Sequence, residues 1–245
     1  MNHKTEAINL KVTKFGEADK LLTLFSKDLG KIKLIAKGAQ KTGSKFGGRL
    51  EILAYNDLLL AEGKEIYILS EVSTIETFHK IRENPVTLKA GIYLAKVIEA
   101  STEIGQKNEG LFDLILRSLY LLQDGISPAL LKKIFEVKLM VSEGFFPVLD
   151  RCVKCGKIKK GEPAKVSFSI PLGGIICSSC FKRGLSALSL SAGALKTLEE
   201  IKEAEGEELK ELELSKEVLK TLDQILKFYI SEHIGTDIRK FGDCP

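Results

Sequence analysis

Apolar and polar residues alternate along much of the first 80 residues, with the period of two that is typical of β-strands. In residues 31–37 the alternation separates an apolar face from a basic face: Ile32, Leu34 and Ala36 against Lys31, Lys33 and Lys37. Similar runs cover residues 7–12, 52–61 and 65–75, and the AEGK segment between the last two indicates a hairpin. About five short strands with little helix predict a small barrel or sandwich.

The spacing of apolar residues becomes helical after residue 84. Asn84 is a favoured N-cap residue and Pro85 suits the first helical position, so a helix is expected to begin there. The pattern predicts an α+β chain with a β domain at residues 1–80 and a helical domain at residues 81–245. Further helices are expected at residues 109–123, from Ser127-Pro128 to Gly144 and Pro147, after Ser191, and after Ser215.

Four of the five cysteines form two Cys-x-x-Cys pairs: Cys152 with Cys155, and Cys177 with Cys180. Each pair can aim two thiolates at one point, and two pairs complete a tetrahedron around zinc. They lie in an insert, residues 150–184, that is short, basic and rich in glycine, with little apolar material for a core. We therefore expect one structural Zn²⁺, whose binding supplies the folding free energy of the insert. Cys244 is expected to take no part.

Three other interpretations of the cysteines stay open: two redox motifs, two disulfides, or an iron–sulfur cluster. A thioredoxin-type motif begins a helix within a βαβ unit, a pattern that the sequence lacks. No apolar run of about 18 residues could cross a membrane, and the N-terminus does not resemble a secretory signal. We therefore expect a cytosolic protein with reduced thiols. Since iron–sulfur clusters usually have other cysteine spacings, zinc is favoured.

Charged residues are unevenly distributed, although the formal net charge is only +4. Residues 27–49 hold seven basic residues and one acid, and residues 151–183 hold eight and one. Such clusters attract polyanions, whereas a single lysine usually lies on a solvated face. Residues 199–217 reverse the balance with nine acids and three lysines, which favours a solvated face over a docking surface for a basic partner. The basic segments favour nucleic-acid binding.

The sequence offers no recognisable catalytic motif, so we expect that the protein is not an enzyme. The three histidines (His3, His79 and His233) lie in no metalloprotease or nucleophile motif, and His233 is expected to pack or cap. Residues 38–45 resemble a phosphate-binding loop, but the lysine follows the serine instead of preceding it. We expect a flexible basic loop that can follow a phosphate backbone without chemistry.

Several segments of the chain together form a recognisable pattern. In the N-terminal part they are Gly16-Glu17-x-Asp19, residues 22–25 (LTLF), Gly30, residues 36–39 (AKGA), Ser44, Arg49 and Leu50. In the C-terminal part they are CVKCG, SIPLGGIICSSC and FYISEHIGTDIRKF. These segments resemble the RecO family of bacterial recombination mediators. The resemblance follows the family's order over nearly the whole chain, and the cysteines are those of its zinc-bearing members.

The resemblance implies an OB-fold barrel followed by a helical bundle that carries a zinc knuckle. It implies a role in DNA repair: binding single- and double-stranded DNA, annealing complementary strands, and helping to load RecA onto coated DNA. The implied partners are DNA, RecR, and the single-strand-binding protein through its C-terminal tail, with RecA as an indirect partner. The implied cofactor is zinc, without a nucleotide, and the implied location is the cytoplasm at the nucleoid.

An OB fold follows a nucleic-acid strand along one barrel face and its adjoining loops. We hypothesise that six cations form the main phosphate track: Lys31, Lys33, Lys37, Lys41, Lys45 and Arg49. Phe46 is the candidate to stack on a base, whereas Phe15 and Phe25 are expected in the core. Binding through the backbone would depend on salt, read little sequence, and suit annealing because the base edges stay free.

The zinc insert is expected to act first as a structural staple, with a DNA contact or a RecR contact as alternatives. The main alternative function is a zinc-ribbon protein-interaction module, for instance a transcription or ribosome-associated factor, which need not anneal strands. A zinc-dependent hydrolase would need an open coordination position, and four sulfur ligands leave none.

Overall fold

The chain forms two compact units in the computed structural model, residues 1–125 and residues 126–243. The structure describes residues 2–64, 66–158, 165–181 and 187–242, so Cys244 lies outside the described residues. The first unit holds a β-barrel and three helices, and the second holds four helices and a small sheet among its described residues. A division of the chain near residue 80 stays a prediction.

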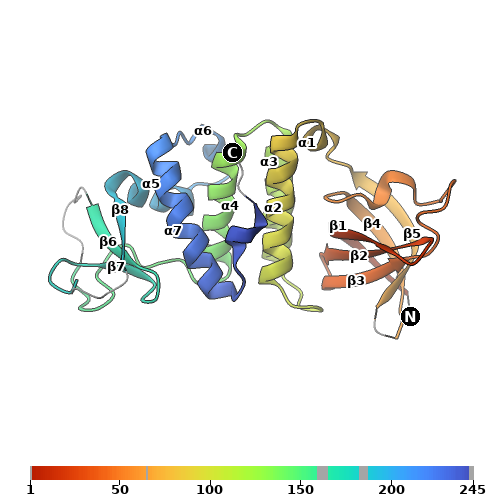
Figure 1. Ribbon diagram of the computed structural model, residues 1–245, viewed down its shortest axis with the longest axis horizontal. Coiled ribbons are helices and arrows are strands. Elements are labelled where there is room, and N and C mark those ends of the chain that lie inside the picture. The colour runs from red at the N-terminus through yellow and green to blue at the C-terminus, as the bar shows by residue number, and fades with distance from the viewer. Residues whose placement is uncertain (1, 65, 159–164, 182–186, 243–245) are drawn as a thin grey trace. The chain divides into compact units, whose positions relative to one another are not determined.

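The first unit begins with a closed five-stranded barrel (Figure 1). Its strands are β1 (Asn2–Phe15), β2 (Asp19–Ser26), β3 (Gly30–Ala36), β4 (Tyr55–Ala61) and β5 (Tyr67–Glu76). The order around the barrel is β1-β2-β3-β5-β4, in which β3 and β5 pair in parallel and the other neighbours are antiparallel. This architecture confirms the predicted OB-like fold.

The barrel interior is apolar, as the alternation along β3 predicts. Its buried residues are Ala7, Leu22, Leu24, Ile32, Leu34, Ala36, Ala39, Phe46, Leu50, Leu58, Leu60 and Leu69. Phe46 is only 2% exposed, so the prediction that its ring stacks on a base is wrong. Phe46 directly precedes the 3₁₀ helix η1 (Gly47–Leu50), and its ring packs into the barrel because burial stabilises a large apolar side chain.

The Phe15 side chain is 46% exposed at the end of β1, so the prediction that it lies in the core is wrong, whereas Phe25 is fully buried as predicted.

Three helices complete the first unit: α1 (His79–Glu83), α2 (Pro85–Ser101) and α3 (Glu109–Gln123). The Asn84 side chain accepts a hydrogen bond from the Val86 N–H at 2.8 Å, which confirms the predicted start of α2. Asn108 caps α3 in the same way, by accepting from the Leu111 N–H at 3.0 Å. Both long helices of this unit therefore begin at capped positions.

The start of β3 is tied closely to the segment that joins α2 to α3. Gly30 has a φ of +66°, and a Cβ atom there would lie 2.0 Å from the carbonyl oxygen of Gln106, so only glycine fits. The Lys31 ammonium donates a 2.6 Å hydrogen bond to the carbonyl of Glu99 and a second one to Thr102. These contacts join the barrel to α2 within the first unit.

The second unit is built around α4 (Pro128–Ser142) and α7 (Lys216–Ile234), which pack together. The other elements are α5 (Ala192–Glu203), α6 (Glu208–Glu211), η2 (Ile238–Phe241), β6 (Lys165–Ser169), β7 (Gly174–Ile176) and β8 (Leu188–Ser191). The side chains of Ser191 and Ser215 cap α5 and α7, which confirms both predicted starts. In the described part of the chain, each helix is too short or too polar to span a lipid bilayer.

The three short strands form one antiparallel sheet, in the order β7-β6-β8. Three apolar residues of the insert are nevertheless buried: Phe168, Ile175 and Ile176. The ring centre of Phe168 lies 5.6 Å from that of Tyr229 on α7. The insert does not enclose a core of its own, because its apolar side chains pack on a helix that follows it in the chain.

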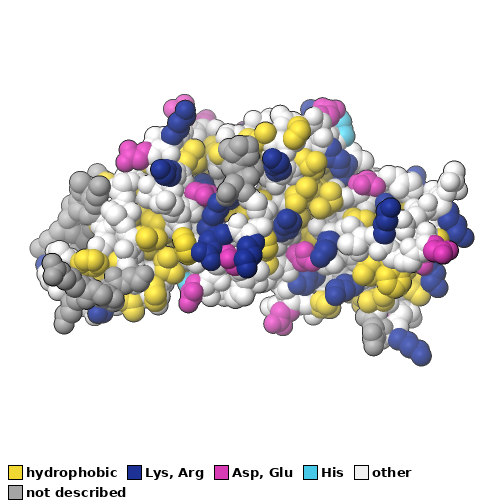
Figure 2. Space-filling view, in the orientation of Figure 1, with side chains coloured by type: hydrophobic (Ala, Val, Ile, Leu, Met, Phe, Trp, Pro, Cys, Tyr) yellow, Lys and Arg dark blue, Asp and Glu magenta, His cyan; other side chains and the backbone are white. Residues whose placement is uncertain are grey.

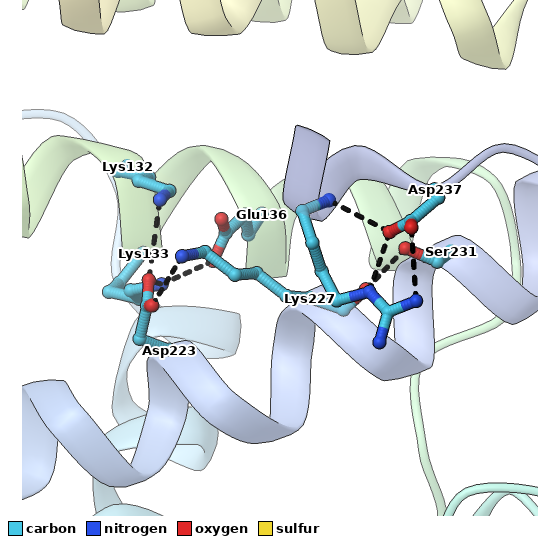
Figure 3. Close-up of polar contacts among 8 residues, drawn as sticks. Lys132, Lys133, Glu136, Asp223, Lys227, Ser231 and Asp237 are labelled. Atoms are coloured by element: carbon cyan, nitrogen blue, oxygen red, sulfur yellow. Dashed lines mark hydrogen bonds and ion pairs between the residues drawn. The ribbon is translucent and has the colours of Figure 1, made fainter. Parts of the chain in front are cut away.

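The packed faces of α4 and α7 contain charged side chains (Figure 3). Asp223 on α7 binds the ammonium groups of Lys133 at 2.8 Å, Lys227 at 2.6 Å and Lys132 at 3.3 Å. Lys133 also pairs with the fully buried Glu136 at 2.8 Å. Burial opposes ionisation of Asp223, but the charge and hydrogen bond of Lys133, assisted by Lys227, hold the pKa of its carboxyl well below the usual range. Asp223 therefore stays ionised.

Candidate metal centre and nucleic-acid interface

The four cysteines predicted as metal ligands converge in the second unit. Their Sγ atoms all lie within 4.8 Å of one another, and those of Cys155 and Cys177 are 3.7 Å apart. Zinc–sulfur bonds of about 2.3 Å in a tetrahedron imply sulfur–sulfur distances of about 3.8 Å. The arrangement can therefore hold one metal ion through four sulfur atoms: Cys152, Cys155, Cys177 and Cys180.

Local backbone turns aim each pair of cysteines. In the first turn the Gly156 N–H donates to the Cys152 carbonyl at 2.9 Å, and Gly156 has the positive φ of +70° that favours glycine. In the second turn the Cys180 N–H donates to the Cys177 carbonyl at 3.0 Å, directly after β7. The Val153 N–H donates to the Ile175 carbonyl at 3.0 Å and so links the first turn to β7. We call the described residues 148–158, 165–181 and 187–191 the cysteine module.

The electrostatics of the cluster suit thiolate ligation. Burial opposes ionisation of Cys152, but backbone N–H groups of Cys177 and Cys155 outweigh it and lower the pKa of Cys152 to about 6. Hydrogen bonds to the sulfurs of Cys155 and Cys177 raise the pKa of Cys180 to about 12. Metal ligation requires thiolates, so a bound cation would displace the thiol protons of the cluster.

Three of the six cations predicted to contact phosphates are exposed on β3 and the turn after it: Lys33, Lys37 and Lys41. Asp19, at the start of β2, holds this turn, since its carboxylate accepts from the Gly38 N–H at 2.7 Å and its carbonyl from the Gln40 amide. Figure 2 shows basic side chains at several places on the visible face of the barrel. The fixed turn keeps Lys37 and Lys41 close to the barrel wall.

The other three cations have partners within the first unit. Lys31 donates to the backbone at the end of α2, and burial lowers the pKa of its ammonium. Lys45 is exposed and donates to the Ser70 carbonyl at 2.9 Å, while the Arg49 guanidinium donates to the Lys45 carbonyl at 2.8 Å. Lys45 and Arg49 are therefore neighbours, and a single track through all six cations stays a prediction.

A hollow of about 590 Å³ on the barrel adds hydroxyl groups that the sequence did not indicate. Its lining residues are Ser44, Gly47, Gly48, Arg49, Thr74 and Thr77. Thr74 and Thr77 come from the end of β5 and the residues after it, far along the chain from the basic segment. Only the pairing of β4 with β5 brings them beside η1, so no local sequence signal could have identified them.

Comparisons with known proteins agree for both parts of the chain. The family model described as "Recombination protein O N terminal" matches residues 1–78, and "Recombination protein O C terminal" matches residues 82–240. A "DNA repair protein RecO" from Caldicellulosiruptor saccharolyticus is 32% identical over 237 residues, which are 97% of this chain and 93% of the relative. Its counterpart from Alkaliphilus metalliredigens is 33% identical over 234 residues, which are 94% of this chain and 93% of the relative.

Proposed function

Because the chain belongs to the RecO family of DNA repair and recombination proteins, we propose that it is a DNA-binding recombination mediator and not an enzyme. In this proposal it binds single- and double-stranded DNA, anneals complementary strands, and helps RecR to load RecA on DNA coated by single-strand-binding protein. The observation that carries the proposal is a closed OB-like barrel with exposed cations, in a chain that the family matches along nearly its whole length.

The proposed DNA contact consists of the cations on β3 and in the segment after it, which we call the basic side of the barrel: Lys31, Lys33, Lys37, Lys41, Lys45 and Arg49. Exposed ammonium groups bind phosphates and release counterions from the nucleic acid, which favours binding without regard to base sequence. The exposed side chains of Lys33, Lys37 and Lys41 are best placed for this role. Lys31 would contribute mainly to the local potential, since its ammonium donates to backbone oxygens of the protein.

Annealing follows from contacts of this kind. Two complementary strands repel each other through their phosphates, and bound cations reduce that repulsion. Phe46 lies inside the barrel, so its ring does not compete with base stacking. A surface that binds the backbone while the base edges stay exposed lets the strands pair without any chemical step.

For the cysteine cluster we propose one structural Zn²⁺ bound by Cys152, Cys155, Cys177 and Cys180. The ion would supply a strong cross-link between the two cysteine turns, and four sulfur ligands would leave no position for a substrate. The spacing of 3.7 Å between two of the sulfurs fits this donor set. The proposed partners RecR, single-strand-binding protein and RecA, and a cytoplasmic place at the nucleoid, rest on family membership.

The test is annealing of two complementary oligonucleotides by the purified, metal-loaded chain without nucleotide, with and without single-strand-binding protein, over a salt series. We expect fast annealing that weakens as salt increases. In the variant K33A/K37A/K41A, DNA affinity should fall, and the slope of log affinity against log salt should decrease by about 2 for single strands, since each phosphate contact contributes about 0.7.

The matched control is K80A/K89A/R117A, which removes the same charge from exposed positions on α1, α2 and α3. It should keep the parental salt slope. An unchanged slope in K33A/K37A/K41A would remove these lysines from the DNA contact. DNA binding without annealing would favour a generic nucleic-acid-binding module over a mediator.

A further inference from the structure

The second unit contains a groove between the cysteine module and α5 that the proposed DNA and metal sites do not use. It has a volume of about 610 Å³, within the range of ligand pockets. Its apolar lining is formed by Phe146, Pro147, Val148, Leu149, Val153 and Leu172. Cys152 also borders the groove, so the first cysteine turn forms part of its wall.

Several large apolar side chains in and near the groove are exposed. Val148 is 38% exposed and Leu172 is 42% exposed, and both line the groove. Ile158 and Phe181, elsewhere in the cysteine module, are 69% and 44% exposed. On the visible face, hydrophobic side chains gather beside β7 (Figure 2). Exposed apolar side chains that line one groove, as Val148 and Leu172 do, typically mark a surface that binds another molecule.

The charged rim of the groove holds three acids and two cations, so its formal charge is negative by one. Asp150 stands on the wall formed by the cysteine module, and Glu199 and Glu203 stand on α5. The two cations of the rim are already paired with acids, Lys202 with Glu203 at 2.8 Å and Arg151 with Asp150 at 3.0 Å. A hydrogen bond to Glu203 and the charge of that carboxylate, assisted by the charges of Glu199 and Asp150, raise the pKa of Lys202.

The acidic character continues along the chain beyond the groove. Residues 205–213, which include α6, hold five acids and one lysine. A rim of this sign repels a phosphate backbone and attracts cations. The groove therefore differs from the basic side of the barrel in both charge and apolar content, and a DNA strand is a poor occupant for it.

We propose that this groove binds a segment of a partner protein in which one or two apolar side chains are flanked by Lys or Arg residues. The apolar side chains would cover Val148 and Leu172. The flanking cations would lie beside Glu199, Glu203 and Asp150, of which the last two already pair with Lys202 and Arg151. Apolar burial supplies affinity in such a complex, and complementary charge supplies orientation and a faster encounter. The proposal goes beyond DNA binding, since it assigns a separate protein-binding surface to the second unit.

The experiment measures fluorescence anisotropy of labelled peptides with the full, metal-loaded chain at moderate salt. The first probe has a Leu-Phe pair between two Lys-Lys-Lys segments, the second has Ser-Ser in place of Leu-Phe, and the third has Glu in place of every Lys. We expect saturable binding of the first probe, affinity about tenfold weaker for the second, and no binding of the third.

Substitutions in the groove test whether the first probe binds there. V148S/L172S should weaken binding of the first probe at least about tenfold, and E199Q/E203Q about fivefold. The matched control E217Q/E232Q neutralises two exposed acids on α7, away from the groove lining, and should bind like the parent. Metal content and thermal unfolding identify any variant that fails to fold. If V148S/L172S does not fold, E199Q/E203Q on α5 decides the test alone, because neither glutamate is a candidate metal ligand.

Several outcomes would overturn the proposal. Equal weakening in E217Q/E232Q and E199Q/E203Q would show unspecific attraction to an acidic protein. Displacement of the probe by an oligonucleotide, with DNA affinity reduced in V148S/L172S, would assign the groove to DNA. A change of oligomeric state in V148S/L172S by sedimentation would assign it to a second copy of the chain. None of these outcomes would affect the annealing test of the barrel.

Discussion

The barrel and the cysteine module are both built from β-strands, but different interactions stabilise them. The barrel closes five strands of 7 to 14 residues around a continuous apolar interior. The module has three strands of 3 to 5 residues, which cannot enclose a core by themselves. In its described residues four sulfur atoms converge, and Phe168 packs against Tyr229 on α7. The comparison predicts that the barrel depends on apolar burial alone, whereas the module depends in addition on a metal ion bound by its sulfur atoms.

The largest effect should come from Cys152→Ser, which tests whether the module depends on its sulfur atoms. Structural zinc binding corresponds to about 10–16 kcal/mol in small zinc-dependent domains, so losing one ligand should remove most of the metal. We expect one metal ion per parental chain and almost none in the variant, by elemental analysis. Amide exchange should accelerate in the cysteine module and stay unchanged in the barrel. Equal loss of protection in the barrel would contradict the comparison.

The reverse experiment is Leu24→Ala in the barrel interior. Leu24 is fully buried, and removing such a side chain leaves a cavity that lowers the free energy of unfolding by about 3 kcal/mol. Urea unfolding should show this loss, while the metal content should equal that of the parent. Phe15→Ala is the control, because the Phe15 side chain is 46% exposed and its removal should cost less than about 1 kcal/mol.

A smaller effect on stability is expected at the contact of α4 and α7, where ion pairs take the place of the apolar contacts in the barrel. Asp223→Asn leaves Lys132, Lys133 and Lys227 without their shared carboxylate. Since the Asp223 side chain is 37% exposed, water screens part of the lost attraction. We expect the substitution to lower the free energy of unfolding by about 1–2 kcal/mol at neutral pH. Urea unfolding measures it, with Glu232→Gln on the same helix as an exposed control.

The pH dependence of that effect has a definite sign. The pKa of the Asp223 carboxyl is lowered in the folded protein, so its stabilising contribution is present above the unfolded value of about 3.9 and is lost as the pH falls below it. The difference between the parent and Asp223→Asn should therefore be constant near neutral pH and shrink below about pH 4. A difference that grew on acidification would assign the effect to other groups.

Local signals in the sequence predicted most of the secondary structure. Asn84, Ser191 and Ser215 each accept the backbone hydrogen bond that their N-cap pattern indicates, and β3 buries the residues that its alternation selects. The short strands of the cysteine module were missed, because three to five residues carry too little periodicity. Phe46 was misassigned because its burial depends on residues far along the chain.

The same distinction applies to the sites. The cysteine spacing predicted the convergence of four sulfur atoms, since each pair lies within one turn. The partners of Lys31, at the end of α2, depend on the contact between β3 and a distant segment. The groove beside α5 likewise joins residues near 150 to residues near 200, so neither segment alone could have indicated it.

The contact between Gly30 and Gln106 has a consequence for exchanging parts between relatives. A barrel taken from a relative must keep glycine at position 30, because the Gln106 carbonyl leaves no space for a Cβ atom there. The helical segment joined to it must present backbone carbonyls that accept hydrogen bonds from the Lys31 ammonium. A chimera joined near residue 80 would take Gly30 and Lys31 from one relative and the segment that contacts them from another. A chimera joined near residue 125 would transfer Gly30, Lys31 and Gln106 together. The segment that can be exchanged as one unit therefore contains the barrel and extends through α3.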